Sequence, residues 1–311
     1  MNIGSQSMVA PLRTVLVKDP RASHVDQATV DAQWQTLHYP DRPDLARVQA
    51  EYAAFFATLA DYDVEIGTLP PAPETTLDSI YTHDPVAAVS RRGVILGNMG
   101  KAARRTEPDA METYLRATGV PILGRIQAPG QVEGGDVCWL DARWRWARAI
   151  APTQKAFASC ARCWTTTWTR SSQCRCPIGP ARTTACIYSR SSARWTTTKR
   201  VVYSRMMPVP FRQLLLDRGV NSSEVPDESM TRLPAMCWQW RPASASCWRA
   251  TPSPGARLEA AVWRCTHFGA RICIKGGGGP TCLAATALAP GLTMPDPVGK
   301  SSHWADGPIS T

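Results

Sequence analysis

The sequence predicts a protein of the α/β class. Short apolar runs of strand length alternate with segments of helical period, and no repeat of roughly 20 to 50 residues is visible. No apolar run approaches the roughly 20 residues needed to cross a bilayer. The 311 residues suffice for one large or two modest domains. We therefore expect strands and helices that follow one another along the chain.

The first elements are a strand at residues 13–17, a long helix at residues 44–63 and a second strand at residues 64–69. The helix is predicted because its hydrophobic side chains recur three or four residues apart and so share one face. These apolar residues are Leu45, Val48, Tyr52, Phe55, Phe56 and Leu59.

Four further elements are predicted. Residues 94–96 form a short apolar strand, and residues 108–119 form a helix that glycine ends. A strand follows at residues 121–126. Residues 210–217 have a helical pattern.

A cysteine behind a glycine-rich turn is the clearest chemical motif. Residues 276–283 read GGGGPTCL, with Cys282 near the C-terminal end. Glycine permits backbone conformations closed to other residues, so the chain can press against a small ligand. A thiolate at Cys282 could then attack a planar cationic carbon. The alternative is an ordinary turn followed by a packing cysteine.

Three upstream segments carry charged side chains. Residues 76–85 (TLDSIYTHDP) place Asp78 and Asp84 six residues apart, a spacing that lets a strand and its following turn direct both into one pocket. Residues 98–108 (NMGKAARRTEP) form a basic turn that opens a helix at Glu107. Residues 133–136 (EGGD) come after the strand at residues 121–126. Carboxylates match the N–H fork of a guanidinium, and an arginine can hold a carboxylate.

Together with Cys282, these segments resemble the dimethylargininase and arginine deiminase branch of the guanidino-group-modifying, or amidinotransferase-like, superfamily. The resemblance covers residues 12–141, 201–228 and 272–283. It implies a five-bladed α/β propeller (pentein) that forms a single domain over residues 1–283. Residues 284–311, rich in small residues and proline, are then expected to be a disordered or artefactual tail.

The resemblance implies a role for each matching residue. Cys282 corresponds to the nucleophile that forms a covalent intermediate. Glu133 corresponds to the carboxylate that orients and activates the scissile group. Asp78 and Asp84 correspond to guanidinium-binding acids, and Arg104 to a contact for the carboxylate of an amino acid.

Asp136, His83 and Arg105, which is the alternative to Arg104, complete the candidate site. His83 stands where dimethylargininases often carry an acid, which leaves the identity of the substrate open. The family also uses a histidine to protonate the leaving amine and to activate water. That histidine has no match among His24, His38, His83, His267 and His303.

The middle of the chain has an unusual composition. Residues 143–200 contain twelve Lys or Arg and no Asp or Glu, whereas the whole chain has a net charge of +10. Residues 143–200 and 230–266 together contain nine of the twelve tryptophans and eight of the eleven cysteines. No helical or strand period organises these segments, so we expect the chain to be irregular there.

Three interpretations account for this composition. The first is a basic arm that binds nucleic acid. The second is a metal site formed by Cys160, Cys163, Cys174 and Cys176. The third, which we favour, is translation in the wrong reading frame over about residues 143–200, 230–256 and 262–266. The propeller should then be distorted or incomplete over these segments.

The genetic code supports the third interpretation. Read one base earlier, the codons of residues 164–170 permit Leu-Asp-Asp-His-Val-Asp-Glu, an ordinary acidic sequence. The codons of residues 185–187 permit Cys-Leu-His, the motif that carries the family's catalytic histidine. The codons of Cys186 and Ile187 therefore encode the missing histidine when they are read in the other frame.

The sequence thus predicts a C–N hydrolase that converts the guanidine of arginine or N-methylated arginine into citrulline and an amine or ammonia. We expect no cofactor, no metal, no specific nucleic acid and no membrane association, and a cytoplasmic location. A homo-oligomer is compatible with the sequence. The alternatives are an amidinotransferase of the same superfamily, or a non-catalytic frameshifted product or basic nucleic-acid-binding protein. The chain as written should be inactive because the histidine is missing.

Overall fold

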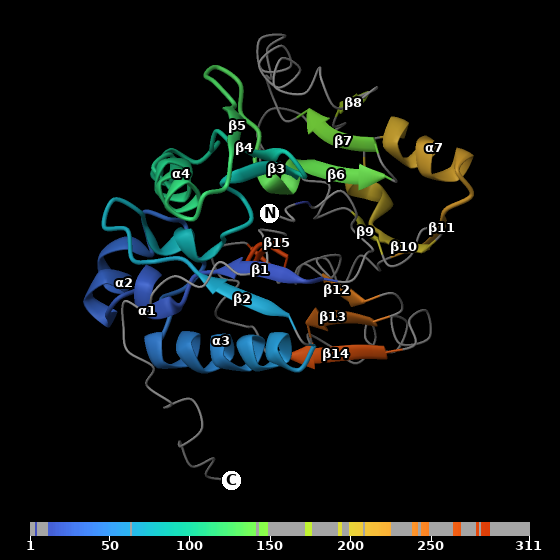
Figure 1. Cartoon of the computed structure of the whole chain (residues 1–311). Coiled ribbons are helices and arrows are strands. Elements are labelled where there is room, and N and C mark those ends of the chain that lie inside the picture. The colour runs from blue at the N-terminus through green and yellow to red at the C-terminus, as the bar shows by residue number, and fades with distance from the viewer. Residues whose placement is uncertain are drawn as a thin grey trace.

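The strands in the described part of the chain form five three-stranded sheets (Figure 1). The structure is a computed structural model. It describes residues 4, 12–62, 64–140, 143–148, 172–175, 192–194, 199–207, 209–224, 238–241, 244–248, 264–268, 278–279 and 281–286. In each sheet the central strand pairs antiparallel with one neighbour and parallel with the other.

The sheet of β3, β4 and β5 shows how local sequence produces this unit. β3 (Val86–Ser90) and β4 (Gly93–Leu96) form an antiparallel hairpin. The chain then crosses through α4 (Glu107–Ala117) and returns as β5 (Ile122–Arg125), parallel to β4. A parallel pair needs such a crossover because its two strands run in the same direction. The predicted strand, helix and strand are confirmed here, whereas β3 was not predicted.

A second complete unit begins at the end of the basic middle segment. β9 (Ser192–Arg194) pairs antiparallel with β10 (Lys199–Val202), which pairs parallel with β11 (Asn221–Glu224). Helix α7 (Val209–Asp217) makes the crossover and confirms the helix predicted at residues 210–217. Val202, Met207, Phe211 and Leu215 form a small buried cluster beneath it.

Strands also occur within the segments that the sequence suggested to be irregular. They are β7 (Arg143–Arg148) and β8 (Ser172–Arg175), which form one sheet with β6 (Val137–Leu140), and β12 (Trp238–Arg241), β13 (Ser244–Trp248) and β14 (Arg264–Phe268), which form another. β9 also lies within the basic middle segment. The expectation was therefore wrong at these strands. Strand pairing uses backbone N–H and C=O groups, which every residue except proline carries, so an unusual composition does not prevent it. Apart from these strands, β9 and residues 199–200, both segments lie outside the described part.

The first sheet joins the two ends of the described chain. β1 (Thr14–Val17) pairs parallel with β2 (Glu65–Thr68) and antiparallel with β15 (Ala285–Thr286). Ala285 and Thr286 were expected to belong to a disordered tail, but they form this strand because β1 offers them a free edge. Residues 287–311 lie outside the described part. The pairing brings the cysteine motif, directly before β15, next to the N-terminal sheet.

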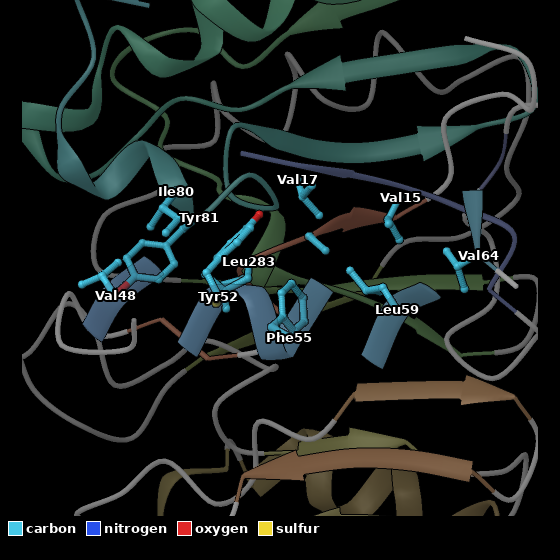
Figure 2. Packing of buried hydrophobic residues seen from close by; sticks show 12 residues of the cluster. Val15, Val17, Val48, Tyr52, Phe55, Leu59, Val64, Ile80, Tyr81 and Leu283 are labelled. Atoms are coloured by element: carbon cyan, nitrogen blue, oxygen red, sulfur yellow. The ribbon is translucent and has the colours of Figure 1, made fainter. Parts of the chain in front are cut away.

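Helix α3 (Leu45–Ala60) covers the first sheet and confirms the long helix predicted from the sequence. The side chain of Asp44 caps its N-terminus by accepting the backbone N–H of Arg47 at 2.9 Å. Its apolar face points toward Val15 and Val17 of β1 (Figure 2). Four of the predicted apolar residues, Val48, Tyr52, Phe55 and Leu59, are at most 1% exposed. The same cluster contains Cys282 and Leu283, so the cysteine segment is part of this core.

Two short helices, α1 (Pro20–Ser23) and α2 (Gln27–Gln33), precede α3 and were not predicted. Each begins at an aspartate whose carboxylate accepts a backbone N–H of the first turn: Asp19 from Arg21, and Asp26 from Thr29. No helix in the described residues is both long and apolar enough to cross a membrane.

Candidate functional site

The cysteine motif forms a tight turn against the N-terminal half of the chain. The backbone N–H groups of Cys282 and Leu283 both donate to the carbonyl of Gly279, at 2.9 and 3.2 Å. A Cβ at Gly278 would lie 2.4 Å from the ring of Tyr81, far closer than packed carbon atoms allow. The glycine at this position therefore permits close approach to Tyr81 of the same chain, whereas the sequence reasoning expected close approach to a ligand. Cys282 itself is 7% exposed.

Backbone hydrogen bonds bring three of the predicted motifs together. The N–H of His83 donates to the carbonyl of Cys282 at 3.1 Å, and the N–H of Gly134 donates to the carbonyl of Asp84 at 3.0 Å. A Cβ at Gly134 would lie 2.2 Å from the carbonyl oxygen of His83, so these chains are in direct contact. The TLDSIYTHDP, EGGD and GGGGPTCL segments thus meet at one place.

Thr82 reinforces this junction and was missed by the sequence reasoning. Its hydroxyl lies 2.8 Å from the carbonyl of Leu16 and 3.2 Å from the carbonyl of Leu283, and it accepts the N–H of Ala285 at 3.0 Å. One side chain, 1% exposed, therefore connects β1, the cysteine turn and β15. The only sequence signal was a small polar residue within a mostly apolar segment.

Asp78 lies on a 3-10 turn (Leu77–Ile80), not on the strand that its spacing suggested. The turn forms because the N–H of Ser79 bonds to the carbonyl of Thr76, and the N–H of Tyr81 to that of Asp78. Asp84 follows in the loop before β3. Both carboxylates are buried, with side chains 1% and 11% exposed, and each is paired with a different cation.

Lys101 pairs with Asp78 and was not among the predicted site residues. Its Nζ lies 2.5 Å from Oδ2 of Asp78 and also donates to the carbonyl of Leu37 at 2.6 Å. The preceding residue, Gly100, donates its backbone N–H to Oε1 of Glu133 at 2.9 Å. The loop after β4 therefore holds two of the predicted carboxylates through neighbouring residues.

Glu133 begins a short 3-10 turn (Gly134–Asp136) and forms a reciprocal cap with Asp136. Oδ2 of Asp136 accepts the backbone N–H of Glu133 at 2.9 Å. Burial raises the pKa of Asp136, and the neighbouring Glu133 charge raises it further. Asp136 thus supports the Glu133 backbone.

Arg104 is at the centre of a buried ion cluster. Its guanidinium donates to both oxygens of Glu107 at 2.8 Å and to Oδ2 of Asp84 at 2.7 Å. It also lies over the ring of Tyr81, 5.7 Å from the centroid. Burial raises the pKa of Glu107 to about 7, although the Arg104 charge opposes this shift. Arg105, the predicted alternative, is exposed.

His83 is partly buried beside Asp84. Desolvation lowers its pKa, while the charge of Asp84 raises it. The imidazole is therefore mostly neutral at pH 7. An acidic residue at the same position would instead be negatively charged. The cysteines of the alternative metal site lie outside the described residues, except Cys174 in β8.

Comparisons with known proteins found similarity in sequence over part of the chain and in fold over most of it. No family model matches the chain. The N(G),N(G)-dimethylarginine dimethylaminohydrolase of Pseudomonas aeruginosa is 32% identical over 123 residues, which are 40% of this chain and 45% of that enzyme. The sequence match thus spans less than half of the relative's length.

Solved structures match over far more of the chain. A cysteine-to-serine variant of the dimethylarginine dimethylaminohydrolase from Pseudomonas aeruginosa, complexed with citrulline, aligns with a TM-score of 0.69 and 19% identity, covering 89% of this chain and 99% of that one. The N-terminal domain of ArgZ, a cyanobacterial arginine dihydrolase, aligns with a TM-score of 0.71 and 12% identity, covering 88% and 97%. The predicted α/β propeller class is confirmed. The chain is therefore similar in sequence to dimethylarginine dimethylaminohydrolase over part of its length, and it has the fold which that enzyme shares with the arginine dihydrolase ArgZ.

Proposed function

We propose that the site hydrolyses a C–N bond in the guanidine of arginine or an N-methylated arginine. The observation that carries this proposal is the junction of Cys282 with the segments that contain Asp84 and Glu133, in a fold of guanidine hydrolases. A cysteine whose segment meets segments that carry carboxylates suits a cationic planar substrate. A structural neighbour bound to citrulline, and an arginine dihydrolase bound to its substrate, support the same class of ligand.

In the proposed reaction the Cys282 thiolate attacks the guanidinium carbon, forming an S–C bond. Glu133 orients the guanidinium through its N–H groups. Asp84 adds negative charge because it shares one cation, Arg104, with Glu107, whereas Lys101 neutralises Asp78. The C–N bond then breaks, and the amine leaves with a proton. Water adds to the remaining carbon and the S–C bond breaks, which releases citrulline and restores the thiol.

No histidine of the sequence matches the family residue that performs the proton transfers. A general acid must protonate the leaving amine, and a general base must activate the water. We propose that the codons of residues 186–187, read in another frame, encode the histidine for both steps. The chain as written then binds substrate without converting it. We propose also that the five sheets are the five blades of a single domain at residues 1–283, and that the enzyme acts in the cytoplasm.

The test compares the chain as written with a version whose reading frame is restored over about residues 143–200, 230–256 and 262–266. Both are incubated with arginine and with N-methylarginine, and citrulline is quantified by mass spectrometry. We expect product from the restored version alone, and none after Cys282→Ser in it. Citrulline from the literal chain would refute the proposed lesion. A folded, restored chain that makes no citrulline would refute the hydrolase.

A further inference from the structure

Tyr81 contacts two of the motifs that meet at the junction. Its ring lies against the cysteine turn, because a Cβ built at Gly278 would lie 2.4 Å from two ring carbons and 2.9 Å from a third. The guanidinium of Arg104 lies over the same ring, 5.7 Å from its centroid. Tyr81 is 1% exposed and belongs to the same core cluster as Cys282 (Figure 2). One buried ring therefore links the turn that carries the cysteine to the buried ion cluster.

The backbone of Tyr81 holds the carboxylate side of the junction. Its carbonyl accepts the N–H of Asp84 at 3.4 Å and Nη2 of Arg104 at 3.3 Å. Arg104 in turn donates to Oδ2 of Asp84 at 2.7 Å. The backbone and the side chain of Asp84 are thus both bonded to groups that contact Tyr81. Since the ring and the carbonyl belong to one residue, Tyr81 sets the distance between the cysteine turn and Asp84.

The sequence of the cysteine turn explains why it needs such a partner. Residues 276–279 are four consecutive glycines, which have no side chains to pack and more backbone freedom than any other residue. The Tyr81 ring is planar and rigid, and its removal from a buried position would leave a cavity beside the turn. A glycine backbone can move into that space at little steric cost. The position of Cys282 therefore depends on the ring against which the turn packs.

From these contacts we propose that Tyr81 is a positioning residue, which holds the Cys282 thiol at the correct distance from the carboxylates that bind the cationic group under attack. The proposal rests on the proposed function. The carboxylates are those of Asp84 and Glu133, whose segments are joined because the N–H of Gly134 donates to the Asp84 carbonyl at 3.0 Å. Without the ring, the thiol should still react but should no longer favour a cation, because the attacking and binding groups are misaligned.

The experiment compares two alkylating reagents of similar shape on the full chain as written. Chloroacetamidine carries a planar cationic amidinium group, and chloroacetamide is its neutral counterpart. In both reactions the Cys282 thiolate displaces chloride and forms an S–C bond, so the ratio of the two rates depends neither on the thiolate fraction nor on a histidine. Mass spectrometry of the peptide that contains Cys282 follows each reaction. Each rate is divided by the rate of the same reagent with N-acetylcysteine.

Four variants separate positioning from general packing. Tyr81→Leu removes the ring, and Tyr81→Phe keeps the ring without its hydroxyl. Tyr52→Leu is the matched control, because Tyr52 is also 1% exposed in the same cluster but lies on α3 against Phe55. Gly278→Ala disturbs the contact from the other side, since the added Cβ forces the turn away from the ring. Urea denaturation establishes that each variant is folded.

We expect the chain as written to react about tenfold faster with the cation, as one charge-assisted hydrogen bond predicts. Tyr81→Leu and Gly278→Ala should abolish this preference, whereas Tyr81→Phe and Tyr52→Leu should keep most of it. The inference is overturned if folded Tyr81→Leu keeps the preference, or if Tyr81→Phe or Tyr52→Leu loses it. If Tyr81→Leu does not fold, Gly278→Ala decides, and an unchanged preference there overturns the inference. An unaltered chain with no preference, or with no reaction at Cys282, refutes the proposed function itself.

Discussion

Replacing Thr82 with valine tests how the cysteine turn is held. Valine has nearly the same shape, so the change removes the hydroxyl with little effect on packing. The buried N–H of Ala285 then loses its acceptor, and the carbonyls of Leu16 and Leu283 lose a shared donor. An unsatisfied buried polar group costs about 1–3 kcal/mol, so loss of the donor and the acceptor should cost roughly 2–4 kcal/mol.

The assay combines urea denaturation with hydrogen exchange of peptides that contain residues 82–86 and 281–286. We expect Thr82→Val to lower the free energy of unfolding and to increase exchange in both peptides, because the turn opens locally. Thr82→Ser keeps the hydroxyl and should restore most of the protection. If valine leaves stability and exchange at the level of the original chain, the hydroxyl does not hold the turn and the reasoning is refuted.

Three other predictions concern packing and charge. Gly278→Ala should destabilise the fold by about 1–3 kcal/mol, because the added Cβ would lie 2.4 Å from the Tyr81 ring. Gly100→Ala is the control, since the atom nearest to its added Cβ is 3.6 Å away. Equal melting temperatures of the two variants would contradict the prediction. Phe55→Ala should lower the free energy of unfolding, measured by denaturation, by about 3–5 kcal/mol, because Phe55 is fully buried against Tyr52. Ala54→Ser, at an exposed position of the same helix, is the control and should leave the free energy of unfolding nearly unchanged. Glu107 has a folded pKa of about 7 against a usual value of 4.5, so the folded state binds its proton more tightly and stability should fall as pH rises between these values. Glu107→Gln should flatten this dependence in urea titrations from pH 4.5 to 7, and an unchanged slope would show that another group titrates.

Local rules explain which elements could be predicted. Helix α3 follows from its apolar period and the cap at Asp44, and α4 begins at Glu107 and ends just before Gly119, as its sequence indicates. The 3-10 turn at Asp78 was mistaken for a strand because four residues that mix apolar and polar side chains fit either structure. Strands in the arginine-rich segments were missed for a different reason. Their pairing depends on backbone hydrogen bonds between segments that are far apart in the sequence, and amino-acid composition does not reveal which segments pair.

The sequence by itself determined the chemical types at the site, namely a cysteine after glycines, three carboxylates in recognisable motifs, and the lack of a matching histidine. These are properties of short segments, so they can be read without a fold. Only the tertiary structure decided which charges neutralise one another: Lys101 pairs with Asp78, and Arg104 lies between Asp84 and Glu107. The contacts of Thr82 join positions 66, 201 and 203 residues apart. These residues come into contact only when the first and last strands pair, and no local sequence pattern predicts that pairing.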